Sequence, residues 1–340
     1  MSRIFICLFV LIGAMSAVMC QLPGHVGVCN GRLGNNLPSE RDVVELYKAN
    51  GIKRMRIYDP NSNTLAALRG SDIELILDVP NIDLPSLQSD ATQWVETNVR
   101  PYFPATKIRY IAVGNEIDPD KPETREFVPQ LLRAMENIHR ALTKFQLENQ
   151  IKVSTATYSA VLQDTSPPSR SSFKESGFMP PVVKFLASIG SPLLVNIYPY
   201  FARVGDPSRV KLEYALFTSQ GVEVFDNGFE YRNLFDAMVD GVYYAIDKAG
   251  GQGVGVVVSE SGWPSGGGGN EETVANAETY YQNLIRHVGG GTPKKGGALE
   301  TYLFAMFDEN EKPGKTTERH FGLFNPNKTP KYNKLGLRSG

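Results

Sequence analysis

The chain has 340 residues, of which 41% are hydrophobic and 21% are charged, and its formal net charge is −1. This length supports one large domain or two medium ones, each with an ample core. The near-neutral charge excludes the basic character of proteins that bind nucleic acid or anionic membranes, so we expect neither as a partner.

The first twenty residues differ from the rest of the chain. Arg3 is their only charged residue, and Ile4–Val18 is almost wholly apolar. This pattern predicts a secretory signal peptide over residues 1–20, cleaved after Cys20 or after Ala17. The apolar run is shorter than the roughly 20 residues of a membrane span. We therefore expect a secreted protein with no membrane association after the signal is removed.

The cysteine and histidine contents are low. Of three cysteines, Cys7 leaves with the predicted signal, Cys20 lies at its end and Cys29 remains, so no disulfide framework is expected. The four histidines share no metal-ligand spacing, and the sequence predicts neither a metal site nor a cofactor. Stability must then come from a core, which favours a large closed fold.

Apolar runs with strand character alternate with amphipathic segments over residues 21–340. The runs are His25–Cys29, Arg54–Tyr58, Glu74–Val79, Arg109–Gly114, Lys152–Thr157, Leu193–Tyr198, Gly255–Ser259 and Leu299–Phe307. Such alternation is typical of parallel β/α proteins. A (β/α)8 TIM barrel typically takes about 250 residues, so we expect residues 21–340 to form one barrel domain with insertions.

Three segments between these runs have the apolar spacing of helices. They are Ser39–Asn50, which opens with an N-cap serine, Pro122–Phe145 and Glu271–Val288. The extra length lies at Phe201–Gly251, which contains strand-like Val222–Phe225 and helix-like Tyr231–Lys248. We expect a small subdomain here, inserted around strand 6 and helix 6.

An open, doubly wound sheet is the alternative fold. Its nucleotide-binding form needs a phosphate-binding loop, but no GxGxxG follows the first strand and no GxxxxGK[ST] occurs in the chain. Gly24–Gly34 is rich in glycine but has a different spacing.

Two carboxylates directly follow apolar strands, Glu116 in YIAVGNE and Glu260 in VVVSE. In a barrel, the C-terminal ends of the strands meet at one mouth, where catalytic groups lie. Taken alone, Glu116 is more simply explained as a loop residue that caps the next helix, whereas for Glu260 a functional carboxylate and a solvated turn residue are equally good explanations. Together, on strands 4 and 7, they form the carboxylate pair that cleavage of a glycosidic bond needs. A metal-dependent hydrolase would also recruit histidine, and none lies at a strand end.

Seven motifs resemble those of the plant glycoside hydrolase family 17 endo-β-glucanases. In chain order they are GVCNGRLGNNLPS (Gly27–Ser39), RIYDP (Arg56–Pro60), VGNEI (Val113–Ile117), NIYPYF (Asn196–Phe201), VVVSESGWPS (Val256–Ser265), FAMFDENEK (Phe304–Lys312) and ERHFGLF (Glu318–Phe324). The resemblance covers essentially the whole mature chain. It departs at Asn30, where the family commonly has an aromatic residue, and we expect this to alter a contact at the cleft floor.

The resemblance implies a (β/α)8 barrel and a retaining double-displacement mechanism, with Glu116 as general acid/base and Glu260 as nucleophile. It places further substrate-binding positions at Tyr58, Asn115, Tyr198, Phe201, Phe307, Glu309, Lys312 and Glu318. Among these, Phe201 and Phe307 are expected in an aromatic wall. Lys312 is expected to hold the nucleophile ionised, unless it is an ordinary surface lysine.

The resemblance therefore implies a monomeric glucan endo-1,3-β-glucosidase of the apoplast, with a β-1,3-glucan such as callose, fungal wall glucan or laminarin as its partner. Retention predicts carboxyl groups roughly 5–5.5 Å apart. A 1,3;1,4-β-glucanase is the alternative enzyme, and a glucan-binding defence protein without catalysis is the alternative of another class. Two alternative roles remain open for Trp263. Its ring either stacks on a sugar or supports Glu260 from beneath.

Overall fold

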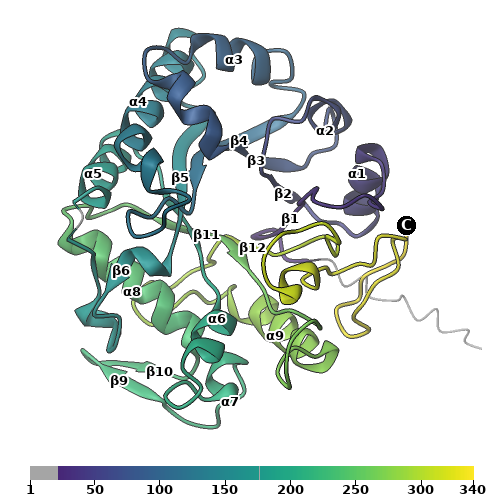
Figure 1. Ribbon diagram of the computed structural model, residues 1–340, viewed down its shortest axis with the longest axis vertical. Coiled ribbons are helices and arrows are strands. Elements are labelled where there is room, and N and C mark those ends of the chain that lie inside the picture. The colour runs from purple at the N-terminus through teal and green to yellow at the C-terminus, as the bar shows by residue number, and fades with distance from the viewer. Residues whose placement is uncertain (1–21, 176) are drawn as a thin grey trace, which may run out of the picture.

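The computed structural model describes residues 22–175 and 177–340, so the predicted signal peptide at residues 1–20 lies outside the described residues. Eight parallel strands form a closed barrel with helices around it, as the sequence predicts (Figure 1). Around the barrel the strands follow the order β1, β12, β11, β8, β5, β4, β3 and β2. Their bounds are β1 Val26–Cys29, β2 Arg54–Ile57, β3 Glu74–Val79, β4 Lys107–Asn115, β5 Lys152–Tyr158, β8 Leu193–Asn196, β11 Val256–Ser261 and β12 Thr301–Leu303.

The helices between the strands bury an apolar face against the barrel. Those of the described residues are α1 Glu40–Ala49, α2 Ser62–Ala67, α3 Thr92–Asn98, α4 Val128–Lys144, α5 Met179–Ile189, α6 Pro199–Gly205, α7 Leu212–Ala215, α8 Leu234–Lys248 and α9 Val274–His287. Helix α1 begins where the sequence predicts, because the Ser39 side chain accepts a hydrogen bond from the Asp42 backbone N–H. Short 3₁₀ helices lie at Asn81–Leu87, Arg125–Phe127, Ser159–Val161, Pro168–Arg170 and Thr316–Arg319.

Two predicted elements differ most in length from those observed. The helix predicted from Pro122 begins at Val128, because the preceding residues form a hydrogen-bonded turn in which the Thr124 hydroxyl donates to the backbone oxygen of Asp118. The strand predicted to reach Phe307 ends at Leu303. Beyond it the backbone N–H groups bond in turn to β11, to the Phe321 carbonyl and to β1, so the chain leaves the regular ladder while still closing the barrel mouth.

The predicted subdomain is present between β8 and α8. It consists of α6, α7 and the antiparallel hairpin β9 Val224–Asp226 and β10 Phe229–Tyr231, which project together from the barrel (Figure 1). A second hairpin, β6 Leu162–Gln163 and β7 Ser172–Phe173, follows β5. The helix α8, which the sequence placed inside the insertion, packs against β11.

The N-terminal ends of the barrel strands are joined by ion pairs. Arg54 Nε lies 3.0 Å from Glu74 Oε2 and its Nη1 lies 2.9 Å from Glu300 Oε2. Arg109 pairs with the same two carboxylates at 3.1 and 3.3 Å. The Tyr302 hydroxyl donates to Glu300 Oε1 at 2.9 Å. These contacts link β2, β3, β4 and β12 at the end of the barrel opposite the predicted active site.

Replacing Glu300 with glutamine is expected to lower the free energy of unfolding by about 3 kcal/mol, because two guanidinium groups then lose a partly buried counter-ion. The matched control is Glu45→Gln, which removes an exposed pair with Lys48 and should cost less than about 1 kcal/mol. Urea unfolding followed by circular dichroism measures both changes. Equal losses in the two variants would contradict a special role for the buried network.

Candidate active site

A cleft with a volume of about 970 Å³ opens at the C-terminal ends of the barrel strands. It is lined by Gly31, Arg32, Leu33, Tyr58, Asp59, Asn115, Glu116, Lys121, Tyr158, Ser159, Ala160, Asn196, Tyr198, Phe201, Ala202, Glu260, Phe304, Glu309, Lys312, Glu318 and Phe321. The structure thus brings both predicted carboxylates into one cleft, together with every predicted substrate-binding residue except Phe307.

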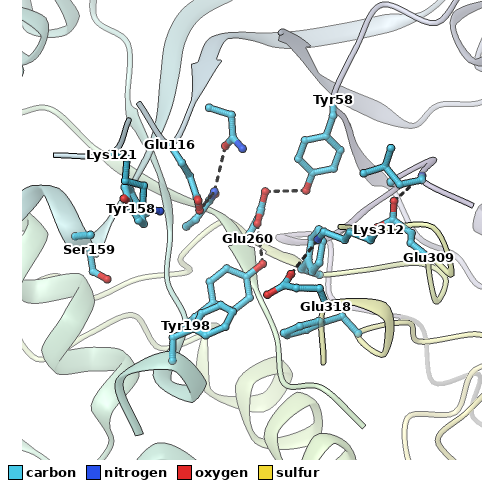
Figure 2. A pocket seen from close by; sticks show the side chains of 18 of the residues that line it. Tyr58, Glu116, Lys121, Tyr158, Ser159, Tyr198, Glu260, Glu309, Lys312 and Glu318 are labelled. Atoms are coloured by element: carbon cyan, nitrogen blue, oxygen red, sulfur yellow. Dashed lines mark hydrogen bonds and ion pairs between the residues drawn. The ribbon is translucent and has the colours of Figure 1, made fainter. Parts of the chain in front are cut away.

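Glu116 lies just after β4 in a tightly constrained backbone. Its φ is +50°, a left-handed conformation that non-glycine residues rarely adopt and that is frequent at functional sites. Gly114 also has a positive φ of +72°, and a Cβ there would lie 2.7 Å from Ile117 Cδ1. The Asn81 side chain holds both backbone groups of Asn115, at 2.8 and 2.9 Å. This turn aims the Glu116 side chain into the cleft (Figure 2).

The carboxyl group of Glu116 has few polar partners. Burial raises its pKa, and the negative charge of Glu260 raises it further. The Asn196 amide, which donates to Glu116 Oε1 at 2.9 Å, acts in the opposite direction, as do the positive charges of Lys121 and Arg56. Because the raising effects prevail, Glu116 keeps its proton to higher pH than an ordinary glutamate does.

Glu260 has the opposite environment. It follows an irregularity in the pairing of β11 with β8, after which its backbone oxygen accepts from the Ile197 N–H. Its Oε1 accepts from Arg56 Nη1 and from the Tyr58 hydroxyl, both at 2.8 Å, and its Oε2 accepts from the Tyr198 hydroxyl at 2.7 Å. Three donors and one positive charge suit an ionised carboxylate, which can only accept.

Arg56 is a residue of the site that our sequence analysis did not assign. Its side chain on β2 is fully buried, and its pKa stays above the usual value because the Asp78 and Glu260 carboxylates outweigh the opposing effect of burial. Two hydrogen bonds of 2.6 and 3.2 Å join it to Asp78. It also donates to Asn115 Oδ1 and Asn196 Oδ1, at 2.9 and 3.0 Å. The available signal was an arginine between Met55 and Ile57, two apolar residues of the predicted strand, where a buried charge needs a partner.

Asn115 and Asn196 are oriented by these donors. Asn115 Oδ1 accepts from Arg56 and from Asn196 Nδ2, at 2.9 and 3.2 Å. The acceptor end of the Asn115 amide is therefore occupied, and its Nδ2 is the end that can donate to a ligand in the cleft. Asn115 thus lies in the cleft, where the resemblance implies a substrate-binding position.

The aromatic wall differs from the prediction. Phe201 lines the cleft and is 41% exposed, but Phe307 is buried, and its ring packs against Phe324. Phe304 and Phe321 provide the wall instead, with ring centroids 5.5 Å apart. Phe307 lies outside the cleft because the chain leaves the regular strand after Leu303, which changes the direction of the side chains that follow.

Trp263 and Asn30 are both buried away from the cleft. The Trp263 indole is fully buried, contacts the ring of Tyr200, and donates from Nε1 to the backbone oxygen of Glu271 at 2.9 Å. Of its two predicted roles, it braces the loop after Glu260 rather than stacking on a ligand. Asn30 is 3% exposed and does not line the cleft, so the predicted contact at the cleft floor is wrong.

Three further charged residues, Glu309, Lys312 and Glu318, form one wall of the cleft. Glu309 accepts from the Leu33 N–H at 2.8 Å, and burial raises its pKa. Lys312 Nζ lies 3.4 Å from Glu318 Oε2 and 4.0 Å from the centroid of the Phe304 ring. Lys312 thus pairs with Glu318, whereas Arg56 is the cation in contact with Glu260.

Neither a metal centre nor a membrane span is found in the part of the chain that the structure describes. There, no group of three or more histidine, cysteine, aspartate or glutamate side chains could hold a metal ion. No helix among these residues is long and apolar enough to cross a bilayer.

Comparison with known proteins places the chain in a family. Residues 26–334 match the family described as Glycosyl hydrolases family 17. The chain is 59% identical over 312 residues to a glucan endo-1,3-beta-glucosidase of Vitis vinifera, covering 90% of each chain. It is 50% identical over 336 residues to an acidic glucan endo-1,3-beta-glucosidase isoform of Nicotiana tabacum, covering 97% of this chain and 90% of the relative.

Solved structures agree with these sequence relatives. A beta-1,3-glucanase and allergen of Cryptomeria japonica pollen is 46% identical, with a TM-score of 0.88, covering 92% of this chain and 99% of that one. One of two plant beta-glucan endohydrolases described as having distinct substrate specificities is also 46% identical, with a TM-score of 0.85, covering 90% and 99%. With the barrel, the cleft and the two carboxylates in place, the chain belongs to glycosyl hydrolase family 17.

Proposed function

We propose that the protein is an endo-1,3-β-glucanase that cleaves β-1,3-glucans with retention of configuration, Glu116 being the general acid/base and Glu260 the nucleophile. The observation that carries this proposal is the contrast between the two carboxyl groups in one cleft. Burial and a neighbouring negative charge favour a proton on Glu116, whereas three hydrogen-bond donors hold Glu260 as an acceptor. Such a contrast separates the acid from the base in glycosidases.

In the first step, Glu260 attacks the anomeric carbon while Glu116 transfers its proton to the glycosidic oxygen. The bond between the anomeric carbon and that oxygen breaks, and a covalent glycosyl-enzyme forms. In the second step, the ionised Glu116 takes a proton from water as the water oxygen attacks the anomeric carbon and releases Glu260. Asn115 Nδ2 is placed to donate to the 2-hydroxyl of the reacting sugar, a contact that strengthens in the transition state.

A retaining mechanism requires the two carboxyl groups to be roughly 5–5.5 Å apart. Hydrogen bonds of 2.8 to 3.0 Å through Asn196 and Arg56 connect Glu116 with Glu260 in one cleft, and we expect their carboxyl groups to have the retaining separation. Following the anomeric configuration of the first product by NMR tests retention directly.

The substrate proposed is a linear β-1,3-glucan such as laminarin, callose or fungal wall glucan. The names of the relatives support the 1,3 linkage, and an open cleft at the barrel mouth suits internal cleavage. Product analysis with laminarin and with barley mixed-linkage glucan tests this choice. Preference for the mixed-linkage glucan would favour the 1,3;1,4-β-glucanase, and binding without release of reducing ends would favour a non-catalytic defence protein.

We also propose that the protein is secreted to the apoplast as a monomer, after removal of residues 1–20. The apolar segment Ile4–Val18 supports secretion. N-terminal sequencing of extracellular protein distinguishes cleavage after Cys20 from cleavage after Ala17, and light scattering of the mature protein measures its mass.

Replacing Glu260 with glutamine is expected to lower the pKa of Glu116, because the change removes a negative charge that raises it. Since the acid must be protonated for the first step, this pKa sets the alkaline limb of kcat/KM in the unaltered enzyme. Carbon-13 NMR titration of the glutamate carboxyl groups measures the shift. Glu318→Gln is the control, because Glu318 pairs with Lys312, and this variant should leave the pKa of Glu116 nearly unchanged.

Replacing Glu260 with alanine is expected to reduce kcat on laminarin by roughly 10⁴-fold, because the covalent step is lost. Tyr198→Phe removes only one donor to this carboxylate and should cost roughly 10- to 100-fold. Azide should restore turnover to the alanine variant alone and produce the α-glycosyl azide. Substantial hydrolysis by Glu260→Ala without azide would exclude Glu260 as the nucleophile.

A further inference from the structure

The cleft has two sides, divided by the proposed catalytic pair. Glu116, Lys121, Tyr158 and Ser159 gather on one side of Glu260, while Tyr58 and the wall of Glu309, Lys312 and Glu318 lie on the other (Figure 2). A general acid must stand next to the leaving oxygen. If Glu116 is the acid, its side of the cleft receives the sugar that departs.

Lys121 is positioned there by a compact turn after β4. Its backbone N–H donates to the Asp118 carbonyl at 3.2 Å, and its own carbonyl accepts from the Arg125 N–H at 2.9 Å. Within the turn, Asp118 Oδ1 accepts from the Asp120 N–H at 2.9 Å. The turn is therefore shaped by its own hydrogen bonds before any ligand arrives, which reduces the ordering cost of binding.

The Lys121 side chain packs against the ring of Tyr158, the last residue of β5. The Lys121 ammonium lies 4.5 Å from the centroid of the Tyr158 ring, within the range of a cation–π contact. The Tyr158 hydroxyl donates to Asp118 Oδ2 at 2.5 Å, and Asp118 is itself 2% exposed. Asp118 thus forms hydrogen bonds both with the Tyr158 hydroxyl and with the turn that carries Lys121. Together these contacts fix the position of the Lys121 ammonium at the edge of the cleft.

We infer that Lys121, held over Tyr158, binds the hydroxyl groups of the glucosyl unit on the leaving-group side of the scissile bond. This inference rests on the proposed function, since it takes Glu116 as the acid. The Lys121 ammonium has three hydrogen-bond donors, and the hydroxyl oxygens of a sugar are acceptors. An aromatic ring at the same place would offer no such donors. Tyr158 serves as a positioning residue, because one face of its ring is covered by Lys121 and its hydroxyl is held by Asp118.

The contact would act in the first chemical step. As the proton passes from Glu116 to the glycosidic oxygen and the bond to the anomeric carbon breaks, the departing sugar must be held in line with Glu260. Lys121 keeps its own protons throughout and donates hydrogen bonds only. A substrate whose leaving group departs without protonation and carries no sugar hydroxyls should not need this contact.

The test compares two substrates in three variants. Lys121→Met keeps an unbranched side chain over Tyr158 but removes the charge, and Lys121→Arg restores a charge. Lys174→Met is the matched control, because Lys174 pairs with Asp120 of the same turn at 2.5 Å but does not line the cleft, so the variant removes a nearby positive charge without changing a cleft residue. The substrates are laminaripentaose and 2,4-dinitrophenyl β-laminaribioside, and kcat/KM is measured for each.

Lys121→Met is expected to lower kcat/KM roughly tenfold for laminaripentaose, the loss expected for one charge-assisted hydrogen bond. For the dinitrophenyl substrate the change should be less than about twofold, since its leaving group needs no proton. Lys121→Arg should recover most of the loss, and Lys174→Met should match the unaltered enzyme with both substrates. An equal loss on both substrates, or no loss on laminaripentaose, would overturn the inference.

The pH dependence of kcat/KM is a second measurement, and a purely structural role of Lys121 would leave it unchanged. The charge of Lys121 lowers the pKa of Glu116, so Lys121→Met should shift the alkaline limb of kcat/KM on the pentaose to higher pH. Glu260, Arg56 and Asn196, the other groups that act on this carboxyl, are unchanged in the variant. An unaltered enzyme that hydrolyses neither substrate would refute the proposed function itself, whereas equal losses in an active enzyme would refute only the role of Lys121.

Discussion

The active site depends on one buried cation. Arg56 is fully enclosed in the barrel, and a charge in that position is tolerated only when it is paired and hydrogen-bonded. Asp78 supplies one partner and Glu260 the other, at 2.6 and 2.8 Å. The charge that would be costly to bury alone therefore keeps the proposed nucleophile in place, with strands β2, β3 and β11 joined through a single guanidinium group.

The same group gives the two proposed catalytic carboxyls different surroundings. Arg56 contacts Glu260 directly but reaches Glu116 only through the amide of Asn196. Burial therefore dominates the pKa of Glu116, and direct pairing dominates the environment of Glu260. A retaining glycosidase needs this asymmetry, because one carboxyl must donate a proton while the other attacks.

The two ends of the barrel have different roles. The N-terminal end stabilises the fold, and the C-terminal end carries the candidate active site. Ion pairs among Arg54, Arg109, Glu74 and Glu300 link the strands at the N-terminal end. At the C-terminal end, polar side chains of the cleft form hydrogen bonds with residues of other strands. A ligand in the cleft can compete for these hydrogen bonds. This division is typical of the TIM barrel, in which loops at the C-terminal face change function without changing the fold.

Local pattern was enough to predict the barrel and the place of its two glutamates. Alternating apolar strands and helices predicted the fold, and Glu116 and Glu260 each follow such a strand directly. The partners of Glu260 could not be predicted, because Arg56 and Tyr58 at the end of β2 and Tyr198 after β8 reach Glu260 on β11 only when the barrel closes. Phe307 failed as a wall residue for the same physical reason, since the path of the chain after β12 depends on contacts with β1, β11 and Phe321 rather than on the pattern of the strand itself.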